Sequence, residues 1–178
     1  MKYILRLSML LTALTFFFAA PSCEAKLYTS MSEGFTLDIP DSFDIQTPPY
    51  GNPNIAVQAV DPSDRAQVTV IVTRDKDADF RKEDVTGKVL ASNKEDLKRL
   101  LLKKKVNLIA DGTFPVAPDH EAMYVRFTKS FKDVTFEQLM VQMWAHKKQY
   151  PLIYGGRIEA GRGDDFLKSA QSLTCTLK

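Results

Sequence analysis

The chain has 178 residues, with 24 Lys and Arg against 22 Asp and Glu, and 44% of its residues are hydrophobic. Its formal net charge is only +2, and both signs are interspersed, so there is no electrostatic basis for nucleic-acid binding. The motifs HExxH, GxSxG and CxxC are absent, which removes the usual signatures of zinc proteases, serine hydrolases and dithiol oxidoreductases.

The N-terminus has the layout of a secretory signal peptide. Lys2 and Arg6 precede an apolar run over residues 7–20, and small residues follow at the end of this run. The run is shorter than the roughly 20 apolar residues that a membrane-spanning helix needs. We therefore expect residues 1–25 to be removed and residues 26–178 to form one domain, which is exported to the periplasm or beyond.

Cys23 offers an alternative fate for the N-terminus. Cys23 and Ala25 fit the small-residue site of a general signal peptidase, which would make Lys26 the first mature residue. The stretch Ala20–Cys23 also resembles a lipobox, in which the cysteine becomes lipidated. A lipobox usually has Leu three residues before its cysteine and tolerates proline poorly where Pro21 lies, so the soluble product is favoured. Membrane attachment is expected only through lipidation of Cys23.

The first part of the domain predicts three strands and a proline-rich loop. Residues 34–40 alternate apolar and polar side chains up to a proline, as a half-buried strand does. Three prolines and a glycine make residues 47–54 a loop. Residues 54–60 and 66–74 flank a turn at 61–64 and predict a hairpin.

A charged helix is predicted next. Ser92 and Glu95 fit a capping box at its start. An apolar stripe follows at helical spacing: Leu97, Leu100 and Leu101. Five cations in residues 98–105 complement the dipole at the end of the helix. This structural role explains the cations better than a role in binding an anionic surface does.

The remaining chain predicts a meander of strands and a closing helix. The strands are residues 106–114, 120–131, 134–148 and 150–160, and the helix is residues 163–175. Short turns join the strands, so the sheet should be largely antiparallel. The third of these strands is apolar on both faces, which predicts a cover on both sides. We expect an α+β fold with helices on both faces of the sheet, a three-layer α/β/α sandwich.

This order of elements resembles the PsbP-like superfamily, which includes the DcrB-type proteins. The likeness lies in the strand Gly34–Pro40 followed by Phe43, and in the closing strand and helix at Tyr150–Thr174. Gly155 and Gly156 depart from the family pattern and predict a bulge or a close backbone approach. The resemblance implies a sandwich fold and an exported or lipid-anchored protein that docks to other proteins, without shared catalytic residues.

Few side chains carry candidate chemistry. His120 and His146 are the only bases with a neutral pKa range, and no motif partner accompanies either, so we expect surface groups. Gly156, Gly161 and Gly163 lie near a helix start, where backbone amides can hold an anion. The lysine of a phosphate-binding loop is missing there, so a strand-to-helix turn explains the glycines. We predict no catalytic residue and no cofactor.

An acidic stretch imitates the beginning of a calcium loop. Asp75, Asp77 and Asp79 have the spacing of the first ligands of such a loop. Phe80 stands where the loop needs glycine, and Thr86 stands where it needs a bidentate glutamate. We therefore expect a solvated acidic loop and no metal site.

Cys175 would be the one thiol of the mature chain. In an oxidising compartment it could pair between molecules, or with Cys23 if that residue stays. Free cysteines are among the most buried residues, so we expect an inert thiol on the last helix.

Large apolar side chains of the second half form a candidate partner-binding patch. The set is Tyr124, Phe136, Met140, Trp144, Tyr150 and Tyr154. Side chains of this set that no helix covers would anchor a partner. Packing in the core under a helix is the favoured alternative for residues at strand period.

These features favour a non-enzymatic binding or assembly module of the bacterial cell envelope. It would dock a protein partner through a sheet edge or through the loop at residues 47–54. An immunity-type inhibitor or chaperone of a secreted effector is the alternative. A hydrolase is the third hypothesis, and it requires a pocket that joins His120 or His146 to an acid.

Overall fold

The computed structural model describes residues 25–46, 53–74, 87–118, 120–145 and 148–175 of the chain. The elements in this part of the chain are β1 (Ala25–Ser30), β2 (Phe35–Pro40), β3 (Asp44–Gln46), β4 (Ile55–Val60), β5 (Gln67–Ile71), β6 (Thr73–Arg74), α2 (Gly87–Lys103), β7 (Asn107–Ala117), β8 (His120–Phe131), β9 (Val134–Ala145), β10 (Lys148–Arg157), the 3-10 turn η4 (Ile158–Ala160), α3 (Gly163–Gln171) and β11 (Thr174–Cys175).

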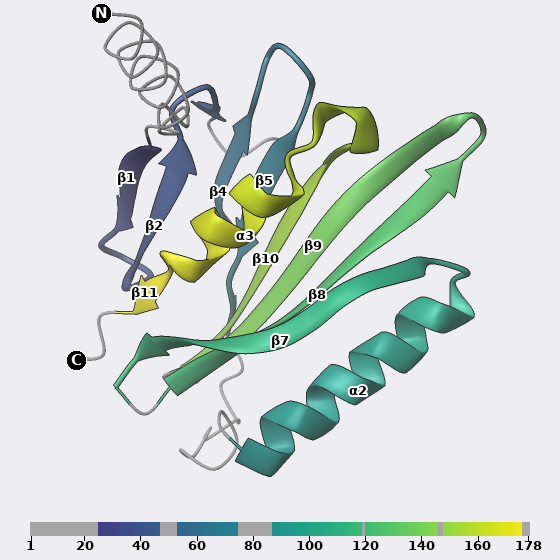
Figure 1. Ribbon diagram of the computed structural model, residues 1–178. Coiled ribbons are helices and arrows are strands. Elements are labelled where there is room, and N and C mark those ends of the chain that lie inside the picture. The colour runs from purple at the N-terminus through teal and green to yellow at the C-terminus, as the bar shows by residue number, and fades with distance from the viewer. Residues whose placement is uncertain (1–24, 47–52, 75–86, 119, 146–147, 176–178) are drawn as a thin grey trace, which may run out of the picture.

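The described strands form two antiparallel sheets (Figure 1). The larger sheet has eight strands in the order β3-β4-β5-β10-β9-β8-β7, with β6 paired to β10. The smaller sheet has three strands in the order β1-β2-β11. The prediction of a largely antiparallel sheet with two helices is confirmed for these residues, including the β4–β5 hairpin and the meander from β7 to β10.

One face of the large sheet, here called the inner face, turns toward the small sheet and α3. Phe35, Leu37 and Ile39 of β2 are fully buried there against strands of the large sheet. Phe166 and Ala170 of α3 belong to the same cluster. α3 therefore shares its layer with a second sheet, which the sequence analysis did not foresee.

The opposite face, here called the outer face, carries α2. Leu90 of α2 packs with Met123 of β8 and Trp144 of β9. Leu101, near the end of the helix, packs with Val125 of β8. Figure 1 shows α2 lying along β7 and β8, far from β4 and β5. The helix thus covers only one half of the outer face.

The two faces of β9 follow the predicted alternation. Leu139, Val141 and Met143 belong to the inner cluster. Met140 and Trp144 belong to the clusters under α2. The amphipathic pattern of this strand was therefore correctly predicted.

The start of the middle helix was predicted incorrectly. α2 begins at Gly87, and Ser92 lies inside the helix, exposed to solvent, rather than at a cap. The buried stripe begins at Leu90, about two turns before the predicted Leu97. Leu90 is 1% exposed, whereas Leu100, which was predicted to belong to the stripe, is 52% exposed. Residues 75–86 lie outside the described residues, so the predicted acidic loop there is untested.

Cys175 lies on a strand and not on the last helix. α3 ends at Gln171, and the chain turns through the buried Leu173 into β11, which pairs with β2. The half-buried Sγ of Cys175 lies 3.4 Å from Sδ of Met143. Burial raises the pKa of the thiol to about 12, against a smaller opposing effect of the Lys148 charge. The thiol therefore stays protonated at neutral pH.

The glycine pair of β10 marks a close approach and not a bulge. The register between β10 and β9 runs without a shift from Lys148 to Arg157. A Cβ on Gly156 would lie 3.3 Å from Cβ of Ala66 and 3.4 Å from the ring of Phe166. Glycine is therefore needed where β5 and α3 press against β10.

Candidate functional site

An open groove of about 1090 Å³ lies at one end of the large sheet. Three segments line it: the β4–β5 turn, the β8–β9 turn with the first half of β9, and the end of β10 with η4. Figure 1 shows these segments side by side along the upper end of the sheet. The groove is therefore built from stretches that lie up to nearly a hundred residues apart in the chain.

The floor of the groove belongs to the outer face, in the half that α2 leaves open. Gln67 of β5 pairs with Gly155 of β10, and Gly155 pairs with Gln138 of β9. The glycine has no side chain, so the sheet is hollow between the two glutamines. Phe136 and Val134 continue the floor along β9 and give it an apolar end.

Two arginines lie at the rim, at the same end of the β5–β10 pair. The register between these strands ends at Gln67 and Gly155, and a Cβ on Gly156 would lie 3.3 Å from Cβ of Ala66. Arg65 directly precedes Ala66 and Arg157 directly follows Gly156, so both arginines lie just beyond this close contact. Both arginines are exposed and line the groove.

The two arginines of the rim differ from the other arginines whose side chains the structure describes. Arg99, Arg126 and Arg162 each form an ion pair with a carboxylate. Arg65 and Arg157 form no such pair with any described residue. Their guanidinium groups are thus available for a ligand.

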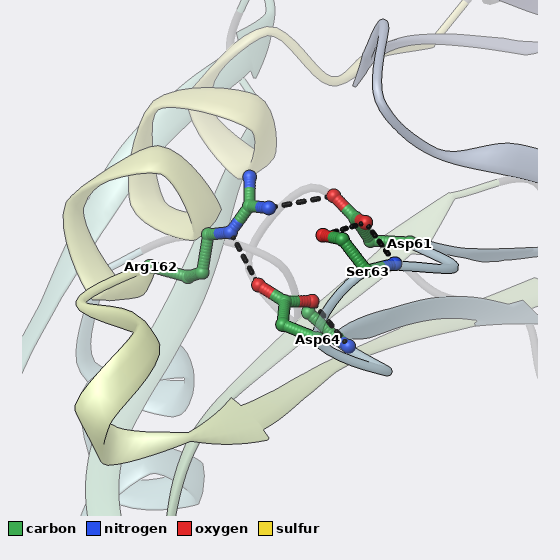
Figure 2. Close-up of polar contacts among 5 residues, drawn as sticks. Asp61, Ser63, Asp64 and Arg162 are labelled. Atoms are coloured by element: carbon green, nitrogen blue, oxygen red, sulfur yellow. Dashed lines mark hydrogen bonds and ion pairs between the residues drawn. The ribbon is translucent and has the colours of Figure 1, made fainter.

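The β4–β5 turn that carries Arg65 is fixed from behind by a buried ion-pair cluster (Figure 2). Arg162, which directly precedes α3, donates from Nη2 to Asp61 Oδ2 at 2.6 Å and from Nε to Asp64 Oδ2 at 2.8 Å. Ser63 donates to Asp61 Oδ1 from its backbone N at 2.8 Å and from Oγ at 2.6 Å. The turn is therefore held against α3 by side chains on both sides.

The carboxylate of Asp61 is the centre of this cluster and is 1% exposed. Burial alone would raise the pKa of Asp61, but hydrogen bonds from Ser42 and Ser63 and the charge of Arg162 outweigh it and lower the pKa to about 2. Asp61 is therefore ionised at every physiological pH, and the cluster is permanently charged.

A second cluster fixes the other wall. Arg126 of β8 forms an ion pair with the buried Glu137 of β9 and donates to Asp164 at 2.7 Å. A Cβ on Gly163 would overlap the ends of the Arg126 and Glu137 side chains, so a larger residue at this position would displace the ion pair. The start of α3 is thus bonded both to the β8–β9 hairpin, through Asp164, and to the β4–β5 turn, through Arg162.

Comparison with known proteins gives a fold and no sequence relative. No protein-family model matches the chain, and no curated protein matches it. The solution structure of cyanobacterial PsbP (CyanoP) from Synechocystis sp. PCC 6803 superimposes with a TM-score of 0.62 at 11% identity, over 88% of this chain and 95% of that chain. The chain has a PsbP-like fold.

Another structure with this fold is the crystal structure of the Saccharomyces cerevisiae Ran-binding protein Mog1p. It superimposes with a TM-score of 0.56 at 11% identity, over 88% of this chain and 97% of that chain. Identities this low establish the PsbP-like fold alone. The expectation drawn from the order of elements is therefore confirmed at the level of the fold.

The PsbP-like fold divides the predicted aromatic patch between the two faces of the sheet. Tyr150 and Tyr154 are 2% and 0% exposed in the inner cluster, where Tyr154 Oη lies 3.1 Å from Ser169 Oγ. Tyr124 also faces inward, where its ring covers Gly112 on β7. Tyr150 and Tyr154 are core residues, whereas Tyr124 is only partly buried and packs against the edge of this cluster.

The other three members of the patch face outward. Trp144 is 8% exposed and packs under α2, and Met140 packs beside the same helix. Phe136 lies beyond the end of that cover and lines the groove. The six residues therefore do not form one surface, and Phe136 alone among them belongs to the candidate site.

Among the other predicted groups that the structure describes, only Gly155 and Gly156 line the groove. His120 Nδ1 lies 3.1 Å from the carbonyl oxygen of Pro118, at the β7–β8 turn. Cys23, His146, the aspartates of the acidic stretch and residues 47–52 of the predicted loop lie outside the described residues. Gly161 has a left-handed φ of 65° and ends η4.

Two kinds of feature are absent from the described residues. No group of three or more His, Cys, Asp or Glu residues in this part of the chain could hold a metal ion. No helix in this part is long and apolar enough to cross a membrane.

The two arginines and the two glutamines of the groove were not predicted from the sequence. Gln67 follows the outward alternation of its strand, and the glycine pair was noted as unusual. What the sequence lacked was the pairing of β5 with β10, which joins strands some eighty residues apart. Without that register, nothing relates Arg65 to Arg157.

Proposed function

We propose that this protein is an exported, non-enzymatic binding module of the bacterial cell envelope, which docks a protein partner in the groove of the outer face. In this proposal residues 1–25 are a signal peptide and residues 26–178 are a PsbP-like three-layer domain, with a helix on each face of its large sheet. The observation that carries the proposal is the uncovered half of the outer face, where the apolar end of the floor meets two arginines that have no acidic partner among the described residues. Arginine beside aromatic groups is the composition typical of docking sites.

The groove is better suited to docking than the free edges of the sheet. β7 is an edge strand, but two register shifts and Pro115 interrupt its hydrogen-bonding pattern. Asp111 on this strand is occupied by Lys94 and Lys98, at 3.0 and 3.1 Å. Bulges, proline and charge are the devices that prevent strand addition at an edge. The opposite edge, β3, is only three residues long.

The fold supports a binding role by analogy. Mog1p, which shares the fold, is a Ran-binding protein. A hydrolase receives no comparable support, because the described histidine, His120, contacts a backbone carbonyl and does not line the groove. An inhibitor of a secreted effector would use the same groove, and the identity of the partner would distinguish that role.

Photo-cross-linking in cells tests the docking face. A photoreactive phenylalanine analogue at Phe136 lies in the groove, and the same analogue at Leu100 lies on an exposed position of α2 and serves as the matched control. We expect one discrete protein adduct from position 136 and none from position 100. The adduct partner, once purified, should bind the protein and should lose affinity for Phe136→Ser. Equal labelling from both positions, or none from position 136, would contradict the proposal.

The intact mass of the protein from soluble and membrane envelope fractions tests the proposed export. A soluble species that begins at Lys26 supports cleavage after Ala25. A membrane species that begins at a lipid-modified Cys23 supports a tethered module. A full-length chain that keeps residues 1–25 and stays in the cytoplasm would contradict export.

A further inference from the structure

We propose that Arg65 and Arg157 together bind a single carboxylate of the docked partner, and that an apolar side chain next to this carboxylate lies over Gly155 and Phe136. The proposal rests on the proposed function and specifies its partner: a peptide segment in which Asp, Glu or the C-terminal carboxylate adjoins an apolar residue.

The position of the two arginines supports a shared anionic ligand. Arg65 precedes Ala66 and Arg157 follows Gly156, two residues in close approach, and both arginine side chains are exposed at the rim of the groove. Two like charges that line one groove repel each other. Because no described acid pairs with either guanidinium, the repulsion between them remains until an anion binds.

The backbone of Arg65 provides a second, independent observation. Its φ is 63°, in the left-handed region that glycine adopts without strain and that other residues rarely adopt. The hydrogen bond from Arg65 N to the Asp61 carbonyl oxygen, at 2.9 Å, belongs to the turn that Arg162 fixes. A side chain kept at a position that favours glycine indicates use of that side chain, since strain of this kind collects at functional sites.

The acids of the groove limit the charge of the ligand. Asp133 lines the groove at the β8–β9 turn and Glu159 lines it in η4, and neither is within ion-pair distance of the two arginines. Both would repel a polyanion. A guanidinium fork matches the geometry of a carboxylate, so one carboxylate with little further charge fits best.

The apolar part of the ligand follows from the floor. Val134 and Phe136 lie beside the hollow over Gly155. Phe131, which pairs with Val134 at the hairpin tip, is 65% exposed and extends this apolar surface. An aromatic or aliphatic side chain next to the carboxylate would bury this surface.

NMR titration of the 15N-labelled protein with N-acetyl-L-phenylalaninate tests the assignment. This probe carries one carboxylate beside one aromatic ring. We expect saturable shifts of the backbone amides of Gln67, Gln138 and Gly155. The uncharged N-acetyl-L-phenylalaninamide should bind about threefold to tenfold more weakly, as expected for the loss of a charge-assisted hydrogen bond at an exposed site.

Variants separate binding from folding. Arg157→Gln and Arg65→Gly should weaken binding of the carboxylate by a similar factor, while the exposed Arg99→Gln on α2 should not change it. Arg65→Gly should also raise the melting temperature by about 2–4 °C, because glycine relieves the left-handed backbone. Weaker binding in a more stable variant is a result that a purely structural role of Arg65 would not produce.

Other results would overturn the assignment. Equal affinity for N-acetyl-L-phenylalaninate and its amide would show that the groove does not recognise a carboxylate. Cross-linking at Phe136 would then still support docking. Larger groove shifts with inorganic phosphate, or with vesicles of phosphatidylglycerol, would assign the arginines to a phosphate ligand or a lipid surface. If no probe shifts the groove residues although position 136 cross-links a partner, the carboxylate assignment fails and the proposed function stands.

Discussion

Arg162 and Arg65 lie at two sides of the same turn and are used in opposite ways. Arg162 is directed inward, to two carboxylates that it shares with the backbone of the turn. Arg65 is directed outward into the groove, at the same rim as a second arginine and without an acidic partner among the described residues. The comparison shows that the same side chain stabilises the fold where it is enclosed by acids and leaves a charge for recognition where it is not.

The two faces of the large sheet repeat this contrast. On the inner face the small sheet and α3 together bury Phe35, Tyr154 and Phe166 completely or nearly so. On the outer face α2 covers one half, and polar side chains and a glycine hollow occupy the other. The covered inner face gives the sheet a rigid core, and the uncovered half of the outer face leaves a surface that is open to a ligand.

The largest loss of stability is expected when Arg162, the inward arginine, is replaced. Arg162→Ala leaves the carboxylate of Asp61 buried without its cation, which should lower the free energy of unfolding by about 3 kcal/mol. Arg157→Ala removes an exposed, unpaired arginine and should change it by less than about 0.5 kcal/mol. Urea denaturation of both variants measures the difference. Equal losses of stability would break the distinction between the two kinds of arginine.

The pH dependence of the free energy of unfolding measures the contribution of the Asp61 cluster. The pKa of Asp61 falls from 3.8 to about 2 on folding, so its contribution of about 2 kcal/mol is complete above pH 3.8 and is lost as the pH falls toward 2. Unfolding at pH 6 and at pH 2.5 measures this loss. Asp61→Asn should flatten the profile in that window, and an unchanged profile would contradict the role of the cluster.

A pair of glycine variants compares the two faces directly. Gly163→Ala places a Cβ against Arg126 and Glu137 on the inner side and should lower stability by about 1–2 kcal/mol, since the guanidinium can move in part. A Cβ on Gly155 would lie 3.6 Å from Gln138 Nε2, an ordinary contact, so Gly155→Ala should fold normally and fill the hollow. Thermal unfolding measures both. A larger loss in Gly155→Ala than in Gly163→Ala would contradict the assignment of the faces.

A gain of stability is expected at Arg65, smaller than the losses predicted for Arg162→Ala and Asp61→Asn. Arg65→Gly should raise the free energy of unfolding by about 1 kcal/mol, because glycine adopts the left-handed φ without strain. Arg65→Ala keeps the strain and serves as the control, with no gain. Denaturation midpoints of the two variants decide this, and a destabilised Arg65→Gly would show that the arginine side chain supports the fold.

Local patterns were sufficient for much of the fold. The alternation in β9, the β4–β5 hairpin and the meander were predicted because each depends on neighbours in the chain. β3 and β11 were missed because they have only three and two residues, and β11 pairs with the distant β2. β1 was missed although it pairs with the neighbouring β2, because five of its six residues are exposed or only partly buried. The helix start at Gly87 was missed because Ser92 and Glu95 imitate a cap within the helix.

The candidate site was less predictable than the fold. Tyr150 and Tyr154 are residues of the type that is common in docking patches. Only the packing of the small sheet and α3 against the inner face shows that they are core residues. Arg65 and Arg157 look like ordinary surface charges in the sequence. Their meaning depends on the β5–β10 register and on a backbone angle, and neither leaves a signal in the amino-acid pattern.

The small sheet also determines when the fold can be completed. β11 pairs with β2, so Thr36 and Thr174, 138 positions apart, meet only after the last strand has left the ribosome. The meander from β7 to β10 consists of neighbouring hairpins and can form early, whereas closure over such a long loop is slow. The small sheet is therefore the last part of the fold that can close, and β2 waits for its second neighbour until synthesis is nearly complete.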